Sequence, residues 1–151
     1  MTARRPQYKV TGVVEAPFRK IVDLLMNVRV GPVGPDNGFY LYNPAGSPLH
    51  LRGGPEEFVA GIATDPNGLR LFVDRTRAML AVEGQWWFRG EVRVEPHPKG
   101  ARVIQEVFNV ARVARWMVPF VQRGMAAKQR QSAEDLLKRI GERLGADSYV
   151  E

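Results

Sequence analysis

The N-terminal part of the chain alternates hydrophobic and polar side chains and then changes to a helical period. In residues 7–15, Tyr8, Val10 and Val14 fall on one face of an extended segment. Pro17 then stands where helices prefer to begin, and apolar side chains follow at helical spacing up to Leu25. The pattern predicts one strand followed by one helix.

Residues 31–55 interrupt this regular pattern. Eleven of them are glycine or proline, a density that regular elements do not tolerate. We expect an irregular connection here, with a short strand at 39–42. The composition on both sides of that strand suits a mobile cover over another part of the molecule.

Strand patterns follow in the middle of the chain. The segments 57–63 and 69–75 are separated by a dense turn sequence at 64–68 and are expected to form a hairpin. Residues 76–82 fit a short helix or a strand equally well. The segment 86–95 alternates apolar and charged side chains, as half-buried antiparallel strands do.

A further strand is expected at residues 102–110, after a loop at 96–100, and we expect it to pair with the segment before that loop. Near Ala111 the hydrophobic period then changes from two residues to 3.6. Pro119 suits a helix start and Gly145 a helix stop. The pattern predicts one amphipathic helix of roughly 25 residues, about 38 Å long at 1.5 Å per residue and therefore able to cross a sheet.

The composition excludes several classes of site. The 151 residues suffice for one domain, which we expect to span residues 1–151. Because the chain has no cysteine, disulfides and cysteine nucleophiles are excluded. His50 and His97 are the only histidines, so a three-histidine metal site is excluded, and we expect no metal and no cofactor. No apolar run approaches the ~20 residues of a membrane span and no signal peptide is recognisable, so we expect a cytoplasmic protein.

The net charge of +6 is concentrated in two segments. Residues 10–111 carry 11 basic and 11 acidic side chains, so the body of the chain is neutral. The excess lies in residues 1–9 and 112–145. A basic helix can follow phosphates, but a solvated helix face has the same composition. We therefore do not expect a nucleic-acid partner.

Three stretches of the chain resemble the START-related helix-grip superfamily, also called SRPBCC, which includes lipid-transfer START domains and bacterial polyketide cyclases and aromatases. The first is the opening strand, Ala-Pro junction and helix at 13–25, and the second is the hairpin formed by 87–96 and 100–103. The third is the C-terminal helix. Their order and spacing carry the resemblance, and the chain departs from the family pattern at 31–55. The resemblance implies an α+β fold in which a curved antiparallel sheet wraps around a long C-terminal helix.

Such a fold leaves a cavity between the sheet and the helix, which favours an apolar or aromatic small molecule. Each wall residue that we expect also fits ordinary core packing. The strands and the helix contribute Phe72, Trp86, Phe88, Val121, Met125 and Gln129.

The last strand of the predicted sheet has polar side chains on both faces, and two registers are open. If Val94 pairs with Val103, Gln105 lies beside Val92 in the cavity, whereas a slip by one residue places Glu106 there. An inward Glu106 would have a raised pKa and could act as an acid or base. An outward Glu106 would pair with a neighbouring arginine, and we favour this interpretation because glutamate is rarely fully buried.

No known catalytic motif stands in the sequence, so no catalytic residue is assigned. We predict that the protein binds a lipid-like, polyketide-like or aromatic molecule. One alternative is a cyclase, aromatase or dehydratase on the same fold. Another is an interaction module that uses the basic C-terminal helix on nucleic acid, a membrane or a protein, although that helix lacks the interleaved aromatic residues of stacking surfaces. Trp87, on the outward side of its strand, suggests a homodimer interface or cover by residues 76–84.

Overall fold

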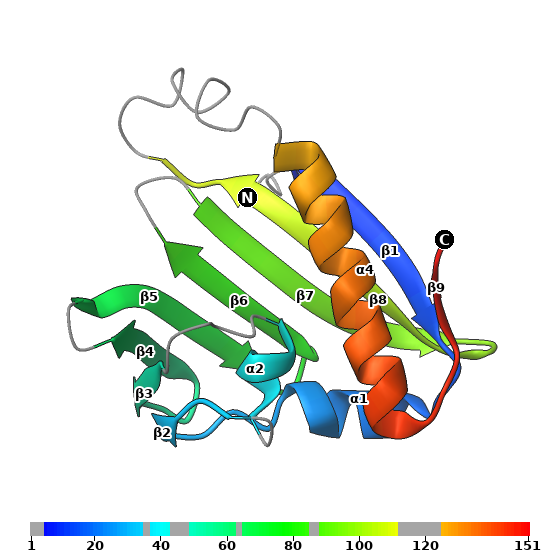
Figure 1. Cartoon of the computed structure of the whole chain (residues 1–151), viewed down its shortest axis with the longest axis horizontal. Coiled ribbons are helices and arrows are strands. Elements are labelled where there is room, and N and C mark those ends of the chain that lie inside the picture. Colours follow the sequence, from blue (N-terminus) through cyan, green and yellow to red (C-terminus); the bar gives the residue numbers. More distant parts are fainter. Residues whose placement is uncertain (1–4, 35–36, 43–48, 63–64, 85–87, 112–124) are drawn as a thin grey trace.

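A large antiparallel β-sheet with helices on one of its faces forms the body of the protein (Figure 1). The computed structural model describes residues 5–34, 37–42, 49–62, 65–84, 88–111 and 125–151. The sheet has nine strands in the order β2-β3-β4-β5-β6-β7-β8-β1-β9. The strands are β1 (Tyr8–Val14), β2 (Gly31–Pro32), β3 (His50–Gly53), β4 (Glu57–Ile62), β5 (Asp65–Asp74), β6 (Met79–Gly84), β7 (Phe88–His97), β8 (Gly100–Asn109) and β9 (Ser148–Val150). The described helices are α1 (Phe18–Leu25), α2 (Gly38–Tyr42) and α4 (Met125–Leu144).

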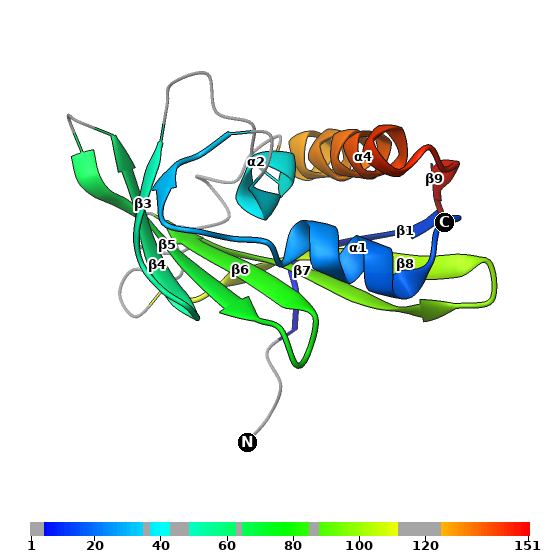
Figure 2. The same cartoon turned by 90° about the horizontal axis from the view of Figure 1, so that it is seen from below.

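The three described helices lie on the same side of the sheet (Figure 2). Strands β3, β4 and β5 bend toward that side, so the sheet is concave where the helices lie (Figure 2). We call this the inner face and the opposite one the outer face. The main core lies on the inner face, where Leu136, Leu137 and Ile140 of α4 pack against the sheet. The fold is therefore α+β, with an open antiparallel sheet and a C-terminal helix.

The predicted strand and helix at the N-terminus are confirmed. Strand β1 ends at Val14, and α1 begins directly after Pro17, whose carbonyl oxygen accepts hydrogen bonds from the backbone N–H groups of Lys20 and Ile21. Proline suits this position because its missing N–H would have no partner in the first turn. Helix α1 then buries Ile21 and Leu25 against the sheet.

The predicted pairing of the two long strands is also confirmed, in one of the two registers. Strands β7 and β8 are antiparallel, with Val94 opposite Val103 and Val92 opposite Gln105. Because side chains on directly opposite residues share a face, this register settles which side of β8 looks toward the helices. Gln105 is on the inner face and Glu106 is on the outer face.

The expected short strand at 39–42 is wrong, because these residues belong to helix α2. Asn37 starts this helix, since its side-chain oxygen accepts a hydrogen bond from the Phe39 backbone N–H at 3.1 Å. Gly38 donates its N–H to the carbonyl oxygen of Asn27 and lies so close to Leu25 that any side chain would collide with the α1 backbone. A tertiary contact with α1 thus decides the local structure.

Several strand boundaries differ from those expected, and β7 and β8 include most of the expected loop at 96–100. Strand β5 begins at Asp65, so most of the predicted turn at 64–68 belongs to the strand. Among the alternatives for 76–82, the strand is observed, since β6 begins at Met79 after a turn. That turn ends at Ala78, whose φ of 52° reverses the chain before β6.

The C-terminal helix ends where the sequence predicts. Helix α4 stops at Leu144, and Gly145 follows in the left-handed conformation with a φ of 62°. The predicted start at Pro119 lies outside the described residues. After the helix the chain adds β9 to the free edge of β1, a strand that the sequence pattern did not predict. Within the described part of the chain, no helix is both long enough and apolar enough to cross a membrane.

Candidate functional site

The inner face of the sheet is apolar almost everywhere that the structure describes it. Strand pairing places uncharged residues at each described inner position of β1 and of β3 to β8. Two polar side chains stand out on β8, Gln105 and Asn109, and both are buried. The side-chain oxygen of Asn109 accepts a hydrogen bond from the Ala111 backbone N–H at 3.0 Å, so its role is to shape the end of the strand.

Gln105 has an unmet hydrogen-bonding requirement. The residue is 6% exposed, and its Oε1 has no hydrogen-bond partner among the described residues. A buried acceptor without a partner costs about 1–3 kcal/mol of stability. Its neighbours in the sheet are Val92 on β7 and Val10 on β1, neither of which offers a side-chain donor. The sheet neighbours therefore leave the oxygen without a partner, and an incoming hydrogen-bond donor would stabilise it.

Tyr42, at the end of α2, brings a phenol to the same place. A hydrogen bond with the Gln105 side chain connects the two residues. Burial raises the pKa of Tyr42 to about 12, and the hydrogen bond with Gln105 offsets part of this increase. At neutral pH the phenol is therefore uncharged, and it keeps both a donor and an acceptor function.

Gly90 explains how the phenol reaches the sheet. This residue lies on the inner face of β7 opposite Val107, and a Cβ at this position would collide with the Tyr42 hydroxyl. The phenol thus lies directly over bare backbone. A side chain at position 90 would push Tyr42 away from Gln105.

Arg139 fixes α2 against α4. Its Nε donates a hydrogen bond to the carbonyl oxygen of Leu41 at 2.7 Å, one residue before Tyr42. Burial lowers the pKa of Arg139 below its ordinary value, while the charge of Asp135 acts in the opposite direction. A guanidinium is one of the few groups long enough to link two helices through a terminal carbonyl. This contact holds the C-terminal end of α2 over the inner face.

Together these contacts form a neutral polar pair in apolar surroundings, which we call the Gln105–Tyr42 pair. Such a pair suits the hydroxyl, amide or carbonyl group of a mostly apolar molecule. It does not suit a metal ion, because the pair offers two neutral ligands and no carboxylate or imidazole. No group of three or more possible metal ligands occurs elsewhere in the described residues.

The other predicted cavity residues are distributed more widely. Phe88 is on the inner face of β7 and packs near Val107 and Ala111. Gln129 is half-buried on α4. Trp86 and Val121 lie outside the described residues, as does Trp87. Met125 is the first residue of α4, and its side chain is outside the described part.

The placement of Phe72 in the inner cavity is wrong. Phe72 lies opposite Ala81 on β6 and Glu57 on β4, which puts its ring on the outer face. There it lies between the guanidinium groups of Arg70 and Arg89, each 5.3 Å from the ring centre. The alternation of β5 already indicates this, because Leu69, Leu71 and Val73 form one apolar face and Phe72 stands between Arg70 and Asp74 on the other.

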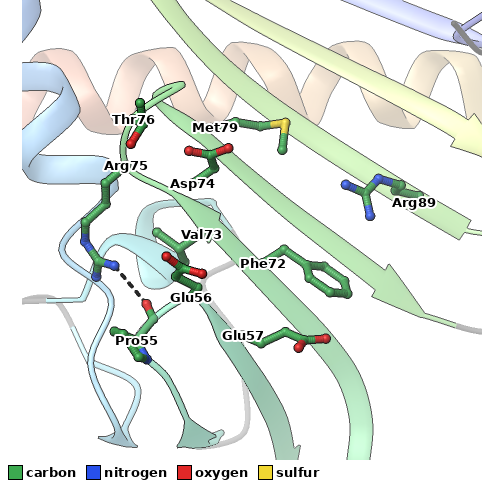
Figure 3. A pocket seen from close by; sticks show the side chains of 10 residues that line it. All are labelled: Pro55, Glu56, Glu57, Phe72, Val73, Asp74, Arg75, Thr76, Met79 and Arg89. Carbon is green, nitrogen blue, oxygen red and sulfur yellow. Dashed lines mark hydrogen bonds between the residues drawn. The ribbon is translucent and has the colours of Figure 1, made fainter. Parts of the chain in front are cut away.

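An open pocket of about 540 Å³ surrounds Phe72 on the outer face. Figure 3 shows the Phe72 ring directed toward Arg89, with Glu57 below it and Met79 above. Three of the charged groups here have partners within the protein: Glu57 pairs with Arg70 at 3.1 Å, Arg89 with Glu83 at 2.8 Å and Asp74 with Arg77 at 3.7 Å. Arg75 donates to backbone carbonyl groups instead.

Glu106 is also on the outer face, so the inward alternative, in which it would line the cavity, is wrong. Its carboxylate forms an ion pair with Arg93 on the neighbouring strand. The observed register therefore corresponds to the outward alternative, in which Glu106 pairs with an arginine.

Sequence reasoning missed three residues of the site, namely Tyr42, Gly90 and Arg139. Tyr42 stands in a segment rich in glycine and proline, where no periodicity marks a buried side chain. Of the three, only Gly90 could have been identified from the sequence, because a glycine within an otherwise alternating strand indicates that another group approaches the backbone closely. Arg139 is one of several basic residues of its helix, and no sequence pattern distinguishes it as a partner of a distant backbone carbonyl.

The comparisons with known proteins place few limits on this site. No protein-family model and no curated protein sequence matches the chain. Among solved structures, the chain is similar to the crystal structure of TTHA0849 from Thermus thermophilus, with 15% sequence identity and a TM-score of 0.45. The similarity covers 90% of this chain and 96% of that one. At this identity and TM-score the resemblance gives no information on function.

Proposed function

We propose that the protein binds a small, largely apolar molecule between the inner face of the sheet and α4, and that the polar end of this molecule bonds to the Gln105–Tyr42 pair. The observation that carries the proposal is the buried Oε1 of Gln105, which has no partner among the described residues. A hydroxyl or N–H group of the ligand would supply the missing hydrogen. The gain in free energy on binding would offset the cost of the orphaned acceptor.

The charge distribution supports a neutral ligand. The described inner positions of the sheet are uncharged, and Arg139, which contacts the residue before Tyr42, already donates to the Leu41 carbonyl. An ionised ligand group would lose its hydration here without gaining a matched partner. A neutral alcohol or phenol would not incur this cost.

We also propose that the chain is a helix-grip protein of the SRPBCC type. The order of elements supports this assignment, because α1 follows β1 directly and the C-terminal helix lies on the inner face of the antiparallel sheet. In that arrangement the space between sheet and helix is the place for a ligand. The departure lies in the segment from β2 to β3, which here contributes α2 and Tyr42.

A matched pair of probes tests the proposal. The compounds 2-naphthol and 2-methoxynaphthalene share one apolar body, but only the naphthol has a donor for Gln105 Oε1. We expect 2-naphthol to bind about tenfold more tightly, which corresponds to about 1.4 kcal/mol for one hydrogen bond. Fluorescence titration and calorimetry measure both constants.

The variant Gln105→Leu should remove this preference, so that both probes bind with similar affinity. Gln131→Leu is the matched control, because Gln131 is exposed on α4 and bonds only to Asp135 in the described structure. An unchanged preference in Gln105→Leu would contradict the proposed role of Oε1. The absence of binding of either probe, together with no small molecule in native mass spectra of the purified protein, would overturn the proposed function.

A further inference from the structure

We propose that a second site, on the side of α1, binds the phosphate group of a small molecule or a lipid headgroup. A pocket of about 390 Å³ lies here and is lined by Arg19, Arg29 and Arg75. Its remaining lining residues are Val22, Asp23, Met26, Asn27 and Val28. The proposal is independent of the function proposed for the inner face.

The three arginines come from three separate segments. Arg19 is in the first turn of α1, Arg29 follows that helix, and Arg75 is in the turn between β5 and β6. On α1, Arg19 and Val22 are one turn apart, and Met26 continues the same face. The fold thus brings Arg75 to the same pocket as Arg19 and Arg29, which are more than 40 residues away in the sequence.

Arg75 is held in place without losing its charge. Its Nη1 donates to the Pro55 carbonyl at 2.8 Å, as Figure 3 shows, and its Nη2 donates to the Val28 carbonyl at 3.4 Å. Two neutral carbonyl groups fix the guanidinium but do not neutralise it. Since a guanidinium has five N–H groups, donors remain for an anion.

The three arginines of this pocket differ from six other arginines of the chain, which form ion pairs with carboxylates. Each of six other arginines has a carboxylate oxygen within 3.7 Å: Arg70, Arg77, Arg89, Arg93, Arg102 and Arg130. In the described part of the chain, no carboxylate forms an ion pair with Arg19, Arg29 or Arg75. Asp23 is the single acidic residue of the lining, which leaves a formal excess of two positive charges.

This excess matches a phosphate monoester, which carries up to two negative charges at neutral pH. Guanidinium groups bind phosphate oxygens through paired N–H donors, and these charge-assisted hydrogen bonds are stronger than neutral ones. The apolar side chains of Val22, Met26 and Val28 form part of the wall. They would accept the carbon skeleton next to the phosphate.

The test measures inorganic phosphate binding at low ionic strength by calorimetry or by NMR titration of the backbone amides. We expect Arg29→Gln to weaken binding at least about fivefold, because one charge-assisted contact is lost. Asp23→Asn should strengthen binding about threefold, because it removes the one opposing charge. Both residues are exposed, so neither exchange disturbs the core.

Arg130→Gln is the matched control, since it removes the same charge from an exposed i,i+4 pair on α4 and should leave phosphate affinity unchanged. Equal weakening by Arg29→Gln and Arg130→Gln would show only a general effect of net charge and would overturn the site. The absence of phosphate binding to the wild-type protein at low salt, together with no binding to vesicles that contain phosphatidic acid, would also overturn it. Binding of inorganic phosphate supports a soluble ligand, whereas binding only to phosphatidic acid vesicles, and not to phosphatidylcholine vesicles, supports a lipid headgroup.

Discussion

The two faces of β7 and β8 differ in whether their polar side chains have partners. On the outer face, charged side chains on neighbouring strands neutralise one another, as in the pairs of Arg89 with Glu83 and Arg93 with Glu106. On the inner face of the same strands, Gln105 has an amide oxygen with no partner among the described residues. These outer-face pairs need no ligand, whereas the amide oxygen on the inner face has an unmet hydrogen-bonding requirement.

We expect the largest loss of stability from a substitution at Gly90, where the Tyr42 hydroxyl lies against β7. In Gly90→Ala the new Cβ would collide with the Tyr42 hydroxyl, and we expect a loss of about 2 kcal/mol in the free energy of unfolding, as for other overpacked cores. The same exchange should be at least about 1 kcal/mol milder in a Tyr42→Phe background, because the colliding atom is then absent. Urea denaturation of the four proteins measures this coupling.

Gly84→Ala is the matched control for this cycle. A Cβ at Gly84 would approach only the flexible end of Leu69 among the described side chains, which can move aside. We expect a loss below about 1 kcal/mol. Equal costs of Gly90→Ala in both backgrounds would show that Tyr42 does not lie over β7.

A smaller effect is expected at the contact between α2 and α4. Arg139→Met keeps the length of the side chain but removes the hydrogen bond to the Leu41 carbonyl, so we expect a loss of about 1–2 kcal/mol. Affinity for 2-naphthol should also fall, because α2 then no longer holds Tyr42 beside Gln105. If Arg139→Met destabilises the protein but leaves naphthol affinity unchanged, the hydrogen bond to the Leu41 carbonyl does not position Tyr42 for binding.

Changes on the outer face should affect stability but not binding. Glu106→Gln replaces a carboxylate that is only 8% exposed by a neutral amide, while Arg93 is 40% exposed and retains water as a partner. We expect a loss of about 1–2 kcal/mol and unchanged naphthol affinity. A marked loss of naphthol affinity in Glu106→Gln would mean that the two faces are not independent.

The smallest effect concerns acid pH at the edge of the sheet. Hydrogen bonds from Arg102 lower the pKa of Glu151 below its ordinary value. A carboxyl group with a lowered pKa stabilises the fold above its unfolded pKa, and this stabilisation disappears as the pH falls through the folded pKa. In Glu151→Gln, the decline of stability below about pH 4.5 should be less steep than in the wild type. Identical slopes from pH 6 to pH 3 would contradict this contribution.

The comparison between the faces also shows what local sequence patterns determine. Strand β1, helix α1, the β7–β8 pairing and the end of α4 were predictable, because alternation, Pro17 and Gly145 act within a few residues of their own positions. Helix α2 and strand β9 were not predictable, because each depends on a contact with a distant segment, α1 in one case and the edge of β1 in the other.

The candidate site was predictable only in part for the same reason. Gln105 was identified as one of two alternatives, and a single pairing, Val94 opposite Val103, decided between them. Tyr42 reaches Gln105 through α2, so no pattern around position 42 indicates its place. The placement of Phe72 in the cavity followed its aromatic character and not its position between Arg70 and Asp74, which puts it on the opposite face from Leu71 and Val73.

The most direct test of the central claim is the free energy of unfolding of the wild type and of Gln105→Leu, each with and without saturating 2-naphthol. Replacing an unsatisfied amide by an apolar side chain of similar size is close to neutral or stabilising. We therefore predict that Gln105→Leu alone is at least as stable as the wild type, and that 2-naphthol stabilises the wild type much more than the variant. A variant that is less stable by more than about 2 kcal/mol and responds to 2-naphthol like the wild type would show that Gln105 serves the fold, and would contradict a ligand site at the Gln105–Tyr42 pair.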